Sequence, residues 1–276
     1  MDRFDNKLAY ITGGSSGIGL EIARQLAPRG TDIVLFARNR ENLEQARHET
    51  EKNKKRDNQK ITCMSLDVQN DDNVREVMKR AVKEFGVPDI LLNCAGISHS
   101  DYFENISYKI FDAVIKTNLY GTRNVIASLL PHMKMKGGAI VIVSSLAGLM
   151  GIFGYTAYGS SKFALIGFSE SLRTELKPHG IRVSVVCPPE VDTPLVTRES
   201  KTIPPEARAM KNMGGLLKPD FVARCIIRGI RKNRYMIIPG FLASLLYYVQ
   251  CFTPGWMFRF SADLIARWGA KKSGRA

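Results

Sequence analysis

Short apolar runs alternate with stretches of helical period along the first 240 residues of the chain. The runs are rich in Val, Ile and Leu, and polar, charged stretches separate them. Apolar runs spaced by helices indicate a parallel sheet that helices cover on both faces. The seven predicted strands are Leu8–Ile11, Ile33–Phe36, Ile61–Leu66, Ile90–Leu92, Ala139–Val143, Val183–Val186 and Tyr235–Ile238.

One helix between these runs is especially clear. Residues 71–85 place an apolar stripe at helical spacing, and Gly86 and Pro88 follow as stop signals. Its members are Val74, Val77, Met78, Ala81, Val82 and Phe85. Because no repeat or low-complexity linker interrupts the pattern, we expect one α/β domain over residues 1–240, with a doubly wound seven-stranded parallel sheet. Residues 241–276 would form a C-terminal helical extension.

A glycine-rich turn joins the first predicted strand to the first helix. Gly13, Gly17 and Gly19 allow a tight turn and a close approach of the backbone to a pyrophosphate at the positive end of a helix. Ser15, Ser16 and Ile18 belong to the same turn. The strand, turn and helix context predicts a Rossmann-type dinucleotide site.

The second strand ends at the position that usually contacts the adenine ribose. Arg38 stands there, where an NAD-preferring site would place Asp or Glu, and a guanidinium suits a 2′-phosphate. We therefore expect NADP(H), the alternative being an exposed surface arginine. Further contacts are expected after the third and fourth strands, from Asp67, Val68, Asn93, Ala95 and Gly96.

Candidate catalytic residues follow the fifth strand. Ser145 precedes Tyr158 by 13 residues, and Lys162 follows Tyr158 by four, which puts Tyr158 and Lys162 on one helical face. A nearby cation favours a phenolate and brings a tyrosine into use as an acid or base. Ser145 could donate a second hydrogen bond to the same carbonyl oxygen. The alternative for this spacing alone is an accident of helix composition.

Taken together these motifs resemble the short-chain dehydrogenases/reductases over about residues 5–240. The resemblance rests on the glycine turn, the Asn93-x-Ala95-Gly96 segment, Asn118, Ser145 and the Tyr158-x-x-x-Lys162 pair. It implies that Tyr158 donates a proton in reduction while Lys162 lowers its pKa and holds the nicotinamide ribose. It further implies that Ser145 orients the substrate oxygen and that Asn118 holds a water linked to Lys162.

One segment departs from the family pattern. After the sixth strand the family usually has Pro-Gly, whereas this chain has Pro188-Pro189 followed by Glu190. Pro188 and Thr193 are still expected beside the nicotinamide, with Thr193 bonding its carboxamide.

Three segments narrow the resemblance to the 3-ketosphinganine (3-ketodihydrosphingosine) reductases, which reduce a long-chain ketone with NADPH. They are PPEVDTP at residues 188–194, GYTAYGSSKFAL at residues 154–165 and ARN at residues 37–39. A hydroxysteroid or retinoid dehydrogenase is the alternative within the family. A non-catalytic NADP-binding scaffold is the alternative of another class, although such proteins commonly lose the Tyr or the Lys.

The C-terminal end combines apolar and basic character. The 24 residues between Arg234 and Arg259 carry no charge, and residues 201–276 hold 14 Lys or Arg against 3 Asp or Glu. Pro239-Gly240 divides the apolar stretch, so that residues 241–252 predict a helix too short to cross a bilayer. Beyond it an amphipathic helix is expected, with Met257, Phe260, Leu264, Ile265 and Trp268 opposite Arg259, Asp263 and Arg267. We expect contact with a membrane surface or with another subunit of a homo-oligomer.

Composition excludes several other classes of protein. The five cysteines form no C-x-x-C pair and the four histidines have no ligand spacing, so neither a disulfide framework nor a metal site is expected. The net charge of +14 is not accompanied by a nucleic-acid-binding motif, so a nucleic-acid partner is not expected. Because the first strand begins within a few residues of the start, we expect a cytoplasmic protein, peripheral on the cytoplasmic face of a membrane.

Overall fold

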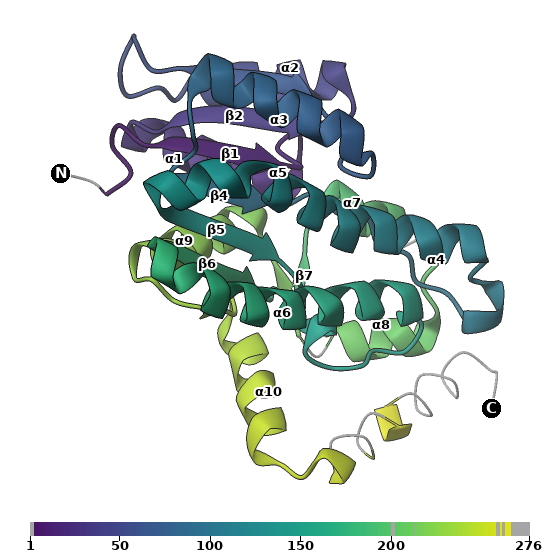
Figure 1. The fold of residues 1–276 in the computed structure, drawn as a ribbon. Coiled ribbons are helices and arrows are strands. Elements are labelled where there is room, and N and C mark those ends of the chain that lie inside the picture. The colour runs from purple at the N-terminus through teal and green to yellow at the C-terminus, as the bar shows by residue number, and fades with distance from the viewer. Residues whose placement is uncertain (1–2, 200–201, 213, 258–259, 261–262, 266–276) are drawn as a thin grey trace.

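A seven-stranded parallel sheet forms the centre of the molecule (Figure 1). The structure is a computed structural model that describes residues 3–199, 202–212, 214–257, 260 and 263–265. The sheet order is β3-β2-β1-β4-β5-β6-β9. Its strands are β1 (Leu8–Thr12), β2 (Asp32–Ala37), β3 (Ile61–Ser65), β4 (Ile90–Asn93), β5 (Gly138–Val143), β6 (Ile181–Val186) and β9 (Met236–Ile237). The strand order reverses direction between β1 and β4, the switch point where ligands of such sheets bind.

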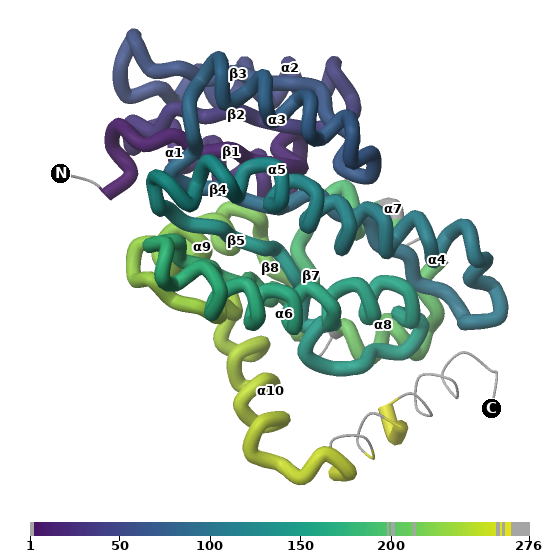
Figure 2. Tube along the Cα trace, viewed as in Figure 1, coloured from purple at the N-terminus to yellow at the C-terminus, as the bar shows by residue number. Residues whose placement is uncertain are grey.

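Helices cover both faces of this sheet, as the tube in Figure 2 shows. The first half contains α1 (Gly17–Leu26), α2 (Arg40–Glu51), α3 (Asp71–Phe85), α4 (Tyr108–Ile115), a π-helical segment (Lys116–Tyr120) and α5 (Gly121–Lys136). The second half contains α6 (Thr156–Leu176), α7 (Pro194–Glu199), α8 (Pro205–Asn212), α9 (Pro219–Arg231) and α10 (Phe241–Phe252). Single 3-10 turns lie at Ala27–Arg29, Phe103–Asn105, Leu146–Gly148 and Lys177–His179.

Alternate residues of each central strand enter two separate cores. In β5, Ala139 and Val141 pack into the core beneath α1, α2 and α9, whereas Ile140 and Ile142 pack into the core beneath α3, α5 and α6. In β1, Tyr10 faces the second of these cores. Two-sided burial is why the strands carry continuous apolar runs, and it confirms the predicted doubly wound sheet.

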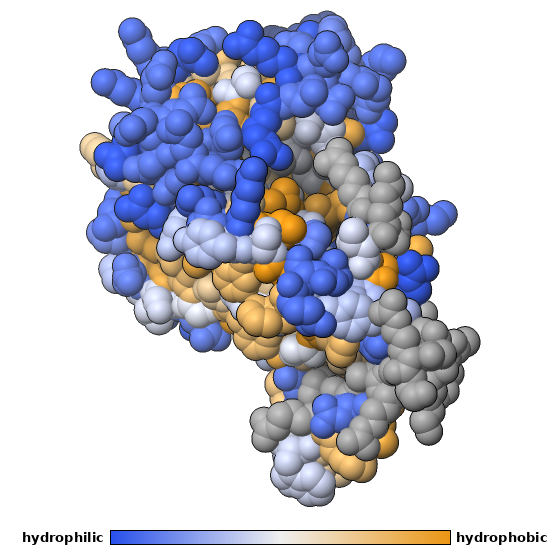
Figure 3. All heavy atoms as spheres, turned by 90° about the vertical axis from the view of Figure 1, so that its right-hand side faces the viewer, coloured by the Kyte–Doolittle hydropathy of each residue, from blue (hydrophilic) through white to orange (hydrophobic). Residues whose placement is uncertain are grey.

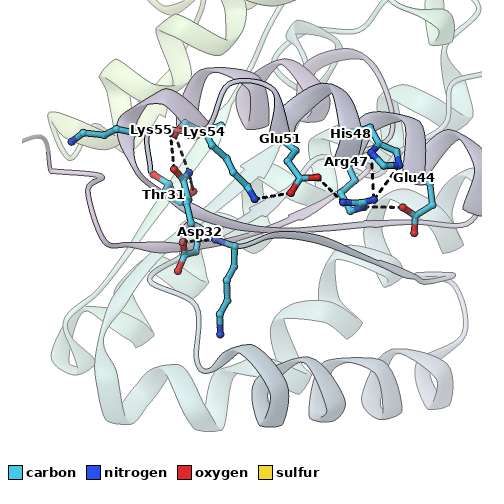
Figure 4. A network of polar contacts seen from close by, with 11 residues as sticks. Thr31, Asp32, Glu44, Arg47, His48, Glu51, Lys54 and Lys55 are labelled. Carbon is cyan, nitrogen blue, oxygen red and sulfur yellow. Dashed lines mark hydrogen bonds and ion pairs between the residues drawn. The ribbon is translucent and has the colours of Figure 1, made fainter. Parts of the chain in front are cut away.

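The outer surface of the first helical layer carries a network of charged residues (Figure 4). Arg47 of α2 lies 2.8 Å from carboxylate oxygens of both Glu44 and Glu51, and Lys54 lies 2.6 Å from Glu51. In the turn that follows, Lys55 pairs with Asp5 at 2.9 Å. This turn therefore ties the end of α2 to the start of the chain.

Predicted and observed elements agree closely. All seven predicted strands are present, and the predicted helices at 71–85 and 241–252 have the observed bounds of α3 and α10. The last strand is shorter than expected because only Met236 and Ile237 pair with β6. The predictions omitted a small sheet of two parallel strands, β7 (Glu190–Val191) and β8 (Leu216–Leu217).

The last helix, α10, projects from the sheet domain (Figure 1). Ala243 is fully buried and Leu246 packs against the cluster around Leu146, while Gln250 donates a 2.8 Å hydrogen bond to the Leu149 carbonyl. Most other apolar side chains of α10 are exposed. In the described part of the chain, no helix combines the length and the apolar character needed to cross a membrane.

The predicted amphipathic helix after α10 is described only in part. Trp256, Met257, Phe260 and Leu264 are exposed, and Ile265 is half-buried. The expected positions of Arg259, Arg267 and Trp268 lie outside the described residues. The division of the chain at residue 240 therefore stays a prediction.

Candidate active site

A cavity of about 590 Å³ lies at the carboxyl ends of the central strands. It runs from the glycine turn after β1, past the ends of β4 and β5, to the segments around α7 and α8. The cavity brings together sixteen of the predicted site residues. They are Gly13, Ser15, Ser16, Gly17, Ile18, Gly19, Arg38, Asp67, Val68, Ala95, Gly96, Ser145, Tyr158, Lys162, Pro188 and Thr193.

The glycine turn has a shape that side chains would destroy. Gly13 and Gly17 adopt left-handed φ angles of +66° and +56°. A Cβ on Gly19 would lie 2.5 Å from the Gly13 carbonyl oxygen, so the turn closes only with glycine there. The side chain of Ser16, which precedes α1, makes no capping hydrogen bond, and α1 has no acidic residue in its first turn. The first N–H groups of α1 are thus available to an anion, which fits a dinucleotide pyrophosphate.

Arg38 lies at the outer end of this cavity, directly after β2. It is exposed, and its guanidinium makes no hydrogen bond or ion pair with any residue the structure describes. Its backbone carbonyl accepts a 3.2 Å hydrogen bond from Ser65 on the neighbouring strand, which fixes the backbone of Arg38. A free guanidinium on a fixed backbone fits a phosphate at this end of a dinucleotide.

Lys162 and Tyr158 lie on the first turns of α6, as predicted. The Lys162 side chain is buried, and its Nζ donates a 2.9 Å hydrogen bond to the Val143 carbonyl at the end of β5. The same Nζ lies 5.4 Å from the centre of the Tyr158 ring. The hydroxyl of Ser144 donates a 2.9 Å hydrogen bond to the Lys162 carbonyl, which fastens α6 to β5. The end of β5 therefore sets the position of Lys162.

Ser145 follows β5 and begins the turn Leu146–Gly148. Its Oγ accepts a 3.2 Å hydrogen bond from the Ala147 N–H, which orients the hydroxyl. The hydroxyl also interacts with that of Tyr158. Ser145, Tyr158 and Lys162 thus come together in one cavity wall from two different elements.

Burial dominates the acid–base properties of these groups. It raises the pKa of Tyr158, and the negative charge of Glu199 adds to that rise, while the Ser145 hydroxyl acts in the opposite direction. The pKa of Lys162 is lowered by burial to about 8. The shift of the Tyr158 pKa is therefore upward, opposite to the lowering expected from Lys162, because removal of the phenol from water dominates it. Tyr158 keeps its proton at neutral pH.

Two predicted residues do not line the cavity. Asn118 is fully buried in the π-helical segment, where its Oδ1 accepts from the Ile97 N–H at 2.8 Å and its Nδ2 donates to Ser161 Oγ at 2.9 Å. These bonds connect the loop after β4 to α6, and the predicted water link to Lys162 stays a prediction. Asn93 is 3% exposed, and its side-chain amide has no partner among the described residues. It is not among the residues that line the cavity.

The predictions missed a group of charged residues in the cavity wall. Lys211 of α8 lies 2.7 Å from Glu190 and 3.0 Å from Glu199, and Ser98 donates a hydrogen bond to Glu199. Tyr155, also in the wall, has a ring centre 5.5 Å from that of Tyr158. The one available signal was Glu190, which stands in the segment that departs from the family pattern. The described residues contain no group of three or more His, Cys, Asp or Glu that could hold a metal ion.

Comparison with known proteins identifies the family to which the chain belongs. A family model for short chain dehydrogenases matches residues 7–204. The chain belongs to the short-chain dehydrogenases. It is accordingly an oxidoreductase that acts on CH–OH groups or the corresponding carbonyls.

Individual relatives are similar over most of the chain. A 3-ketodihydrosphingosine reductase of Bos taurus is 42% identical over 246 residues, which cover 87% of this chain and 73% of the relative. A 3-oxoacyl-[acyl-carrier-protein] reductase of Thermotoga maritima is 32% identical over 82% of this chain and 90% of its own length. Among solved structures, levodione reductase superposes with a TM-score of 0.78 at 23% identity, covering 86% of this chain and 96% of its own. That structural likeness confirms the fold.

Proposed function

We propose that this protein is an NADPH-dependent reductase of a lipid-like ketone, and that it converts 3-ketosphinganine to sphinganine. The observation that carries the proposal is the single cavity that joins the glycine turn and Arg38 to Ser145, Tyr158 and Lys162. The mammalian relative at 42% identity supports this choice of substrate, since its name states a 3-ketodihydrosphingosine reductase.

A nicotinamide cofactor, when bound, would supply the hydride to the carbonyl carbon. Ser145 and Tyr158 donate hydrogen bonds to the carbonyl oxygen, where negative charge develops. The proton of Tyr158 then moves to that oxygen, because an alkoxide is a stronger base than a phenolate. Lys162, held by Val143, supplies a positive charge beside the phenolate that forms.

The choice of NADPH over NADH rests on Arg38. Its guanidinium is free of partners among the described residues and lies at the ribose end of the cavity. No carboxylate follows β2 directly to bond a ribose 2′-hydroxyl, since Arg38 and Asn39 stand there.

A lipid-like substrate fits the other end of the cavity. Leu146, Met150 and Ile152 form an apolar wall there, and Leu246 and Ile265 from the C-terminal extension complete it. Figure 3 shows apolar residues gathered over the middle and lower part of one face, below a hydrophilic upper part. We propose that the extension rests peripherally on the cytoplasmic face of a membrane.

The activity is tested by following NADPH oxidation with a panel of ketones. The panel contains 3-ketosphinganine, a 3-ketosteroid, retinal and a 3-oxoacyl thioester. We expect turnover with 3-ketosphinganine that exceeds turnover with every other compound. Preferred reduction of the steroid, retinal or thioester would contradict the substrate assignment, and absence of any NADPH oxidation would contradict the enzyme assignment.

Membrane contact is tested by flotation with vesicles that contain anionic phospholipid. Phe252→Glu places a charge on α10 at a side chain that is 85% exposed, and Met135→Glu does the same on α5 at one that is 91% exposed. We expect the wild type and the Met135 variant to float and the Phe252 variant to remain in solution. If wild type does not float, and sedimentation shows a dimer that Phe252→Glu dissociates, α10 is a subunit contact instead.

A further inference from the structure

Two carboxylates share one ammonium in the cavity wall. Glu190 of β7 and Glu199 at the end of α7 both pair with Lys211 of α8. Their side chains are 18%, 4% and 11% exposed, respectively. In the part of the chain that the structure describes, Lys211 is the one cation paired with either carboxylate. Among the described residues, one ammonium thus faces two carboxylates in a largely buried place, and a further cation there would be stabilised.

The described residues leave part of the hydrogen-bonding capacity of this group unused. Glu199 uses one oxygen for Ser98 and the other for Lys211, whereas Oε2 of Glu190 makes no hydrogen bond or ion pair with a described residue. All four residues line the cavity. An acceptor for a donor group of a ligand is therefore present.

A buried hydroxyl beside these carboxylates is only loosely held. Tyr155 is 4% exposed and lines the same cavity, and its OH makes no hydrogen bond of standard geometry with a described residue, although the Glu199 carboxylate interacts with it. Lys211 Nζ lies 5.8 Å from the centre of its ring. Burial, with the charge of Glu199 adding to it, raises the pKa of Tyr155, so this group stays a neutral hydroxyl. A buried hydroxyl without a hydrogen bond of good geometry is costly, which again indicates that a ligand atom completes the site.

The group lies next to the reaction centre. The ring of Tyr155 is tilted against that of Tyr158 at 5.5 Å between centres, and the charge of Glu199 reaches the Tyr158 phenol. A cation bound by Glu190 and Glu199 would thus be close to a carbonyl held by Tyr158 and Ser145. In a 2-amino ketone the ammonium group is attached to the carbon next to the carbonyl carbon.

We propose that Glu190, Glu199 and Tyr155 form a subsite for the ammonium group of a 2-amino ketone. This inference rests on the proposed function and assigns the recognition of its amino group. Ammonium N–H groups donate to the free oxygen of Glu190, to Glu199 and to the hydroxyl of Tyr155. Lys211 holds the two carboxylates at a fixed separation. Its ammonium compensates part of their negative charge before the substrate binds.

The test compares two ketones that differ only in the amino group. One is 3-ketosphinganine, and the other is the same long-chain hydroxyketone with hydrogen in place of the amine. We expect wild type to prefer the amino ketone by roughly 10- to 100-fold in kcat/KM, the range for a hydrogen bond to a charged group. Glu190→Gln should abolish most of this preference, chiefly through a higher KM for the amino ketone. Glu190→Asp should restore part of the preference.

Two further variants guard against a change in folding. Tyr155→Phe keeps the ring and should lower kcat/KM for the amino ketone only, by several-fold. Glu206→Gln is the matched control, because Glu206 is also buried on α8 and accepts a 3.1 Å hydrogen bond from Tyr102, yet does not line the cavity. It should keep the wild-type preference.

The outcomes separate the two proposals. If wild type reduces both ketones equally well, the ammonium subsite is refuted while the reductase assignment stands. The subsite is equally refuted if Glu190→Gln and Tyr155→Phe lose activity toward both ketones in the same ratio. If wild type reduces neither ketone but does reduce another compound of the panel, the proposed function itself fails, and the inference fails with it.

Discussion

Replacement of Arg38 by leucine gives the sharpest test of cofactor choice. Arg38 has no partner to lose among the described residues, so the substitution leaves no unpaired group behind in the protein. Its backbone is held by Ser65, and the following Asn39 caps α2 through its own side chain, so the local fold should survive. Any effect on activity then comes from the missing guanidinium.

The size of the effect follows from the exposure of Arg38. A hydrogen bond to a charged group contributes about 1.5–3 kcal/mol when it is shielded from solvent, and solvent screening reduces this contribution to about 1–2 kcal/mol for an exposed group. That corresponds to a roughly 5- to 30-fold loss of kcat/KM for NADPH. Because NADH carries no 2′-phosphate, its kcat/KM should not fall.

The assay measures kcat/KM for both cofactors at a fixed, saturating ketone concentration. Arg228→Leu is the matched control, because it removes the same charge from an exposed position on α9. Arg228 does not line the cavity. This variant should leave the ratio of kcat/KM for NADPH to kcat/KM for NADH unchanged. If Arg38→Leu lowers kcat/KM for NADPH and NADH equally, or lowers neither, the reasoning is refuted and Arg38 is only a surface residue.

Three further predictions concern the reaction centre and its turn. Tyr158→Phe should abolish turnover while NADPH binding, followed by fluorescence titration, survives; substantial residual turnover would remove Tyr158 from its role. Gly19→Ala should raise the NADPH dissociation constant at least tenfold, because the new Cβ would lie 2.5 Å from the Gly13 oxygen, and an unchanged constant would show that the turn tolerates the methyl group. Since burial lowers the pKa of Lys162 to about 8, it is charged below that pH and neutral above it, so kcat/KM for NADPH should fall as pH rises through about 8. A value of kcat/KM that stays constant across this pH would contradict the assignment, and so would the same fall at the same pH in the Lys162→Arg variant.

The sequence was sufficient for most of the sheet because its strands are buried on both faces. Ala139 to Ile142 could be identified as a strand since all four side chains are apolar and enter one of two cores. Two-residue strands such as β7 and β8 leave no period to detect. They form because the tertiary fold brings the segments around Pro188 and Gly215 side by side.

Within the site, residues that belong to motifs could be predicted and residues that meet across the cavity could not. Glu190, Glu199 and Lys211 have no spacing that indicates a common site, and separately each reads as a solvated charge. Asn118 was identified from its motif, but its contacts depend on the π-helical segment, which no local sequence pattern announced. The direction of the Tyr158 pKa shift likewise depends on burial, a property of the folded chain.

The position of Leu246 has a consequence for how the enzyme meets its substrate. This residue lines the cavity, while Leu245 and Val249 on the same helix α10 are each 46% exposed. If α10 rests on a bilayer, a long-chain ketone can move from the lipid leaflet along α10 into the cavity without crossing bulk water. The quantity that then governs the rate is the mole fraction of ketone in the leaflet. Dilution of the ketone with inert phospholipid should slow the reaction even when its amount per volume of suspension stays constant.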